Sequence, residues 1–292
     1  MESVTWHDHP HLRHPLLVVA FEGWNDAGDA ASLAVAYLAR TWGAEPFARI
    51  DPEEYFDFTE TRPQVKIVDG TTRSIEWPST EFLAAEVPGT GRDVVLVRGV
   101  EPQLRWRTFC DAVLSVSQDS GVEMAVILGA LLADVPHTRP VKVSGTTDDH
   151  ELAGRLGLDT STYEGPTGIV GVLHDSFERA GVSTASFWAA VPHYVHQVPS
   201  PKAALALVER SAALVGARVN PLELRVAADE YERQVSERVA DDEDAAAYVA
   251  QLEEADDFEQ REAGAAATLP PDAGRLAEEV ERFLREHRGG ET

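Results

Sequence analysis

The sequence predicts an α/β protein: a three-layer α/β/α arrangement with a mostly parallel sheet, followed by a C-terminal α-helical extension. Three observations predict this fold class. Short, wholly apolar runs recur along the first two thirds of the chain, segments with helical spacing separate them, and the strand patterns stop after Gly216. Apolar strands joined by helical crossovers are typical of parallel sheets that are covered on both faces.

The apolar runs have the length of strands. The run at 16–21 has six apolar residues between Pro15 and Gly23, which is too short for a helix. We expect strands at 16–21, 94–97, 124–128, 141–145 and 186–191. We expect helices at 27–42, 103–118, 150–156, 170–180 and 201–215. Two more polar segments, 65–68 and 72–77, flank Asp69-Gly70, which predicts a hairpin turn.

The composition changes after Gly216. Residues 218–292 contain 21 acidic residues and 9 arginines, and their apolar residues recur only at helical spacing. We therefore expect two parts, an α/β core domain at 1–217 and an acidic α-helical extension at 218–292.

The net charge is −25, which excludes whole classes of partner. Such a surface repels nucleic-acid phosphates and anionic lipid, and no basic patch is visible, so we expect neither nucleic acid nor membrane as a partner. The longest apolar run, 124–133, is about half the length of a membrane-spanning helix. A single cysteine, Cys110, and an N-terminus without signal-peptide character predict a cytoplasmic protein.

Candidate site residues follow two of the buried strands. Asn25 and Asp26 stand at the carboxyl end of the first strand, where open α/β sheets bind ligands. Equally, either side chain could cap the helix that follows. Glu101 follows the strand at 94–97, where it could act as a base or hold a ribose hydroxyl. It could also form an ion pair with Arg105 one helical turn later.

Later segments add further pocket candidates. Arg139 could anchor an anion, and Thr146 could donate its hydroxyl to phosphate or substrate. The turn formed by Gly165, Thr167 and Gly168 precedes a helix, and it could cradle an anion or allow close helix packing. His193 and His196 resemble a metal pair, but no third ligand has a suitable spacing, so we predict no metal site and no cofactor.

Several of these segments, in this order, resemble the proteasome assembly chaperone 2 family. The segments are Tyr-Glu-Gly-Pro-Thr-Gly-Ile at 163–169, Val-Pro-His-Tyr at 191–194 and Pro-Ser-Pro-Lys-Ala-Ala at 199–204. Others fit the high-GC bacterial branch of the family: Asn-Asp-Ala-Gly at 25–28, Glu101-Pro102 with Trp106, and Pro-His-Thr-Arg-Pro at 136–140. The resemblance runs from about Leu16 to Gly216, and the acidic tail looks like a C-terminal extension of that branch.

The resemblance implies a fold similar to purine nucleoside phosphorylases and related hydrolases, assembled as homo-oligomers such as a homotrimer. Archaeal and eukaryotic relatives help to assemble proteasomes, and several end in a hydrophobic-Tyr-any tripeptide, whereas this chain ends in Gly290-Glu291-Thr292. The expected function is that of a non-enzymatic, oligomeric chaperone or adaptor with a protein partner. The alternative is a nucleoside phosphorylase- or hydrolase-like enzyme, with the candidates above lining a pocket at the strand ends.

Overall fold

The computed structural model describes residues 3–159 and 163–267. The chain divides into two compact units, Met1–Arg238 and Val239–Thr292. The terminal tripeptide at 290–292 lies outside the described residues.

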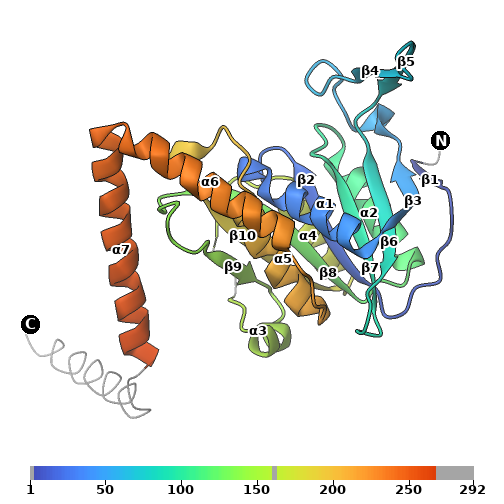
Figure 1. The fold of residues 1–292 in the computed structure, drawn as a ribbon. Helices are drawn as coiled ribbons and strands as arrows, with labels where there is room; N and C mark the ends of the chain where they lie inside the picture. The colour runs from blue at the N-terminus through green and yellow to red at the C-terminus, as the bar shows by residue number, and fades with distance from the viewer. Residues whose placement is uncertain (1–2, 160–162, 268–292) are drawn as a thin grey trace, which may run out of the picture. The chain divides into compact units, whose positions relative to one another are not determined.

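An eight-stranded sheet runs through the first unit in the order β1-β3-β6-β7-β2-β8-β10-β9 (Figure 1). Its four central strands, β7, β2, β8 and β10, are parallel to one another. The strands are β1 (Val4–Trp6), β2 (Leu16–Glu22), β3 (Glu45–Ile50), β6 (Thr80–Glu86), β7 (Asp93–Val100), β8 (Met124–Ala133), β9 (Val143–Thr146) and β10 (Ser183–Pro192). The prediction of a mostly parallel sheet is therefore correct for the four strands in the middle of the sheet.

Antiparallel strands complete the sheet on both sides. On one side β6 pairs with β7, β3 with β6 and β1 with β3, and on the other side β9 pairs with β10. The sheet as a whole is therefore mixed. The strands β1, β3 and β6 were not expected from the sequence: β1 and β3 lack an uninterrupted apolar run, and the run of β6, at 82–85, is short and half alanine.

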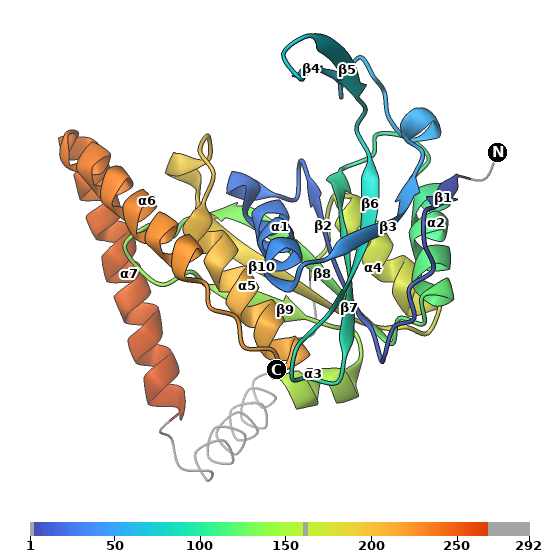
Figure 2. The ribbon, with the colours of Figure 1, turned by 45° about the vertical axis from the view of Figure 1, so that its right-hand side comes forward.

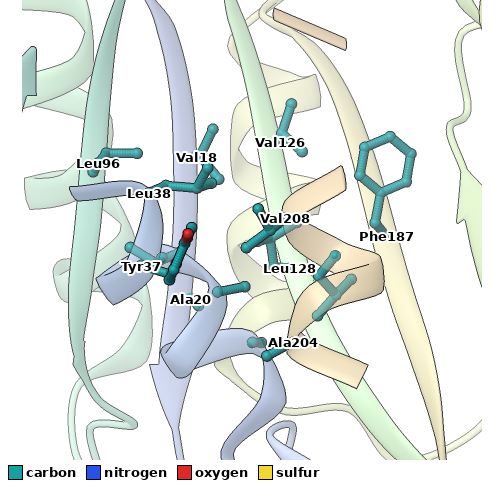
Figure 3. Packing of buried hydrophobic residues seen from close by; sticks show 14 of the residues in the cluster. Val18, Ala20, Tyr37, Leu38, Leu96, Val126, Leu128, Phe187, Ala204 and Val208 are labelled. Atoms are coloured by element: carbon teal, nitrogen blue, oxygen red, sulfur yellow. The ribbon is translucent and has the colours of Figure 1, made fainter. Parts of the chain in front are cut away.

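Helices cover both faces of the sheet, so that the predicted three α/β/α layers are confirmed (Figure 1). The residues of β2 alternate between the two cores: Val18 and Ala20 face α1 and α5, whereas Val19 and Phe21 face α2 and α4. Figure 3 shows the first of these cores. The helices are α1 (Ala30–Trp42), α2 (Trp106–Asp119), α3 (His150–Leu156), α4 (Ile169–Arg179) and α5 (Pro201–Val215), with short 3-10 turns at Ala27–Asp29, Pro52–Glu54 and His193–Val195.

Helix α6 (Leu222–Ala240) packs along α1 and α5. The Tyr37 hydroxyl donates a hydrogen bond to the Asn220 carbonyl at 3.1 Å, just before α6 begins. Arg40 of α1 forms an ion pair with Glu223, and Leu224 is buried in the same core as α1. Nearly all of α6 therefore lies in the first unit.

One further element of the first unit is not part of these layers. The predicted hairpin is present as β4 (Gln64–Val68) and β5 (Thr72–Glu76), which form a separate two-stranded sheet away from the large one (Figure 2). Helix α7 (Glu243–Ala267) is the described part of the second unit. Within the described ranges no helix combines the length and the apolar character needed to cross a membrane.

Candidate functional site

The carboxyl ends of β2 and β7 meet the start of α4 at one polar cluster, formed by Asn25, Glu101 and Gly168. Glu101 connects the three segments. Its Oε1 accepts a hydrogen bond from Asn25 Nδ2 at 3.2 Å and another from the backbone amide of Ile169 at 2.8 Å. Its Oε2 lies 3.4 Å from the backbone nitrogen of Trp24. The carboxylate thus satisfies the first amide of α4, where the helix dipole also favours negative charge.

Gly168 is required at this cluster by its close packing. A Cβ atom at this position would lie 1.9 Å from Asn25 Nδ2 and 2.6 Å from Glu101 Oε1. Its φ of −100° is open to any residue, so the space, and not the backbone conformation, demands glycine here. Of the two readings of this glycine-rich turn, the structure supports close packing of the helix start.

Asp26 is a buried helix cap. Its side chain is 4% exposed, and Oδ1 accepts a hydrogen bond from the Ala31 amide at 2.6 Å. The Ser32 amide lies 3.3 Å from Oδ2. Burial raises the pKa of Asp26 to about 6, because desolvation of the charged carboxylate outweighs these hydrogen bonds. The capping role expected for this position is present.

The ion pair considered between Glu101 and Arg105 does not form. Arg105 Nη1 lies 2.5 Å from Glu54 Oε2 instead, while Glu101 turns toward α4. Arg105 has a φ of 53°, so the chain turns sharply before α2 and the regular one-turn spacing of a helix is absent between the two residues.

The other candidates are not all brought to this cluster. Thr146 ends the edge strand β9 and pairs with Ser186, so three strand positions, about 14 Å, separate it from β2. Arg139 lies in the loop between β8 and β9. Gly165 and Thr167 are exposed just before Gly168.

The two histidines considered as a metal pair serve local contacts. His193 Nδ1 lies 3.1 Å from Asp134 Oδ1, and His196 Nδ1 lies 2.8 Å from the His193 carbonyl oxygen. Each of these contacts is made to a neighbouring residue of the loop or to the end of β8.

Sequence reasoning missed a second polar cluster, which joins three of the motifs behind the family resemblance. The Tyr194 hydroxyl lies 2.8 Å from the backbone nitrogen of His137 and 2.9 Å from its Nδ1, and Nε2 of the same ring lies 3.0 Å from Ser236 Oγ of α6. Lys202 Nζ donates to the His137 carbonyl and pairs with Glu232. Only the shared motif order could have signalled this cluster, because its bonded partners are 30 to 99 residues apart in the sequence.

Several large apolar side chains in the segments that carry the first cluster are exposed. Trp24 is 66% exposed beside Asn25, and Leu131 and Leu132 are exposed just after Ala130, whose amide donates to the Asn25 carbonyl. Tyr163, Leu104 and Val198 are further exposed members at the same edge of the sheet.

Cys110 is expected to be unreactive in the native protein. It is fully buried in α2, and burial raises its pKa to about 12, so the thiolate is not formed near neutral pH. A thiol reagent at pH 8 should label the urea-unfolded chain completely and the native chain not at all over the same period. Rapid labelling of the native chain would contradict the buried position.

The fold and site define a three-layer α/β protein in which Asn25 and Glu101, at the ends of two strands, are hydrogen-bonded to each other and Glu101 to the start of α4. The chain belongs to the PAC2 family, whose model matches residues 20–239. A PAC2 family protein from Streptomyces avermitilis is 51% identical, with 80% of this chain and 99% of that chain covered and a TM-score of 0.76. No curated protein matches the chain.

Two further solved structures bear on the comparison. A proteasome-assembly chaperone homologue of Mycobacterium tuberculosis is 49% identical, with 80% of this chain and 99% of that chain covered and a TM-score of 0.74. An archaeal proteasome activator from Pyrococcus furiosus is 17% identical, with 81% and 99% covered and a TM-score of 0.66, which is a similarity of fold.

Proposed function

We propose that this chain is a non-enzymatic, homo-oligomeric chaperone or adaptor of the cytoplasm that acts through protein–protein contacts. The observation that carries the proposal is the exposed apolar face of the β4–β5 hairpin. Val65, Ile67, Ile75 and Trp77 are between 49% and 59% exposed. The relative from Mycobacterium tuberculosis is a proteasome-assembly chaperone homologue, which supports the same class of function for this chain.

The apolar side chains lie on one face of the hairpin. Val65 pairs with Ile75, and Ile67 lies two residues further along the same face. The opposite face carries the polar residues Gln64, Lys66, Ser74 and Glu76 together with Val68, and Lys66 forms an ion pair with Glu76 at 2.5 Å. An isolated two-stranded sheet is marginally stable in water, so a covering surface would stabilise the hairpin as well as the assembly.

The charge of the hairpin favours a second copy of this chain as the covering surface. Residues 62–77 carry three basic and two acidic residues, in a chain with a net charge of −25. The hairpin is thus a slightly basic, apolar arm on a strongly acidic protein. Such an arm is electrostatically complementary to the acidic surface of another copy.

The polar cluster at the strand ends supports this proposal over a phosphorylase- or hydrolase-like enzyme. A base or ribose-binding group needs free acceptor positions that point into a pocket. Glu101 instead receives hydrogen bonds from Asn25, Ile169 and Trp24, and Asp26 caps α1. These carboxylates therefore have structural roles, and these roles explain their positions without a substrate.

The test is the oligomeric state of a hairpin variant. Ile75→Asp places a charge on the apolar face, and we expect sedimentation velocity at micromolar concentration to show a loss of the oligomer formed by the unchanged protein. Ser74→Asp is the matched control, because it adds the same charge to the neighbouring residue on the polar face, across from Lys66. A monomeric unchanged protein, or an Ile75→Asp variant of unchanged size, would refute the proposal.

A further inference from the structure

A third group of polar side chains lies away from both clusters described above. Ligand atoms of Asp148, His174 and Glu178 all lie within 4.8 Å of one another. His174 and Glu178 are one turn apart on α4, and Asp148 comes from the loop between β9 and α3. His174 Nε2 and Glu178 Oε1 are 3.2 Å apart.

The ring of His174 is oriented by a residue outside this group. Its Nδ1 lies 2.7 Å from Ser186 Oγ on β10, and Ser186 is 6% exposed. When the serine oxygen accepts a hydrogen bond from Nδ1–H, the proton of the neutral imidazole is on Nδ1. Nε2 then carries the lone pair and faces the two carboxylates. Metal-binding histidines are held in the same way, through a hydrogen bond to the ring nitrogen that does not bind the ion.

The two carboxylates lack a cationic partner other than the imidazole. Carboxylate oxygens of Asp148 and Glu178 lie within 4.8 Å of each other. In the part of the chain that the structure describes, neither forms an ion pair with lysine or arginine, and the imidazole of His174 is the one basic group beside Glu178. Two adjacent carboxylates repel each other unless a proton or a cation lies between them.

We propose that Asp148, His174 and Glu178 bind one divalent transition-metal ion of the zinc class. One imidazole nitrogen and two carboxylate oxygens are donors that zinc accepts, whereas magnesium and calcium prefer oxygen ligands alone. The ion balances the two negative charges and keeps coordination positions for water. By joining Asp148 to α4, it ties the edge strand β9 and α3 to the helix layer. This inference is independent of the proposed oligomeric function.

Thermal unfolding of the full-length, chelator-treated protein tests the site. Zinc at about a hundred times its dissociation constant is expected to raise the melting temperature by about 5–10 °C, and magnesium at the same concentration by none. His174→Gln is expected to remove the shift. Ser186→Ala keeps all three ligands and is expected to weaken zinc binding about 10–100-fold in calorimetry.

The controls separate this site from other histidines. His11→Gln removes an exposed N-terminal imidazole and should leave the zinc shift unchanged. Should His174→Gln fail to fold, Asp148→Asn, at an exposed position, is the deciding variant, and loss of the visible absorption bands of bound cobalt is its readout. No zinc shift in the unchanged protein, or a full shift in the ligand variants, would overturn the proposal.

Discussion

Replacing Gly168 with alanine is expected to lower the melting temperature of the first unit by about 6–12 °C. The new Cβ would lie 1.9 Å from Asn25 Nδ2, so either the Asn25–Glu101 hydrogen bond breaks or the start of α4 moves. Overpacking of this kind costs about 1–3 kcal/mol, and loss of the hydrogen bond to a charged group adds to it. A total of about 3 kcal/mol in a unit of this size corresponds to that temperature change.

Gly154 provides the matched control. It lies inside α3, and no atom lies within 4 Å of the Cβ that alanine would add there. Gly154→Ala should leave the melting temperature unchanged or raise it slightly, because alanine favours the helix by about 0.5–1 kcal/mol. Equal melting temperatures for the two variants, measured by circular dichroism, would show that the cluster of Asn25, Glu101 and Gly168 can rearrange without a loss of stability.

Replacing Asp26 with asparagine is expected to stabilise the protein near neutral pH. Burial raises the pKa of Asp26 from 3.8 to about 6, so the folded state binds this proton more tightly than the unfolded state does. The favourable contribution of the protonated carboxyl is complete below about pH 4 and is lost as the pH rises through about 6. Above that, the buried charge costs up to about 3 kcal/mol, which asparagine avoids while its carbonyl oxygen can still accept from Ala31.

Urea unfolding of both proteins at pH 5 and pH 8 measures this difference. The Asp26→Asn variant should be more stable at pH 8 by about 1–3 kcal/mol, and its advantage should fall to about half at pH 5. Comparing the two proteins at each pH cancels the general effect of the net charge of −25. If the stability advantage of the Asp26→Asn variant instead grew toward pH 5, the charged form of Asp26 would be the form that stabilises the folded protein.

The sequence predicts the middle of the sheet better than its sides. The strands β2, β7 and β8 are buried on both faces and therefore contain uninterrupted apolar runs, such as Leu16–Phe21. The strand β3 reads Glu-Pro-Phe-Ala-Arg-Ile, and its partner β6 alternates buried with partly exposed residues. Each has too little apolar character to be distinguished from a loop by pattern alone.

In the site, too, contacts between residues close in the sequence could be predicted, whereas contacts between distant residues could not. The cap at Asp26 could be predicted, because Ala31 is five residues away. The contact between Glu101 and the Ile169 amide spans 68 residues, and the position of Asp148 beside α4 depends on how β9 and α3 fold back. No spacing rule in a single sequence reports such contacts. Only the order of the family motifs indicated that these segments belong together.

The central position of β2 sets the order in which the protein can fold during its synthesis. The strand β2, one of the first to be made, lies between β7 and β8, so its edge toward β8 lacks a partner until β8 has been synthesised. At about 5–20 residues per second, the roughly 110 residues between the end of β2 and the end of β8 take about 6–22 s to translate. During that interval the apolar run Leu16–Phe21 keeps at least one unpaired edge, which can pair with other chains before the sheet is complete.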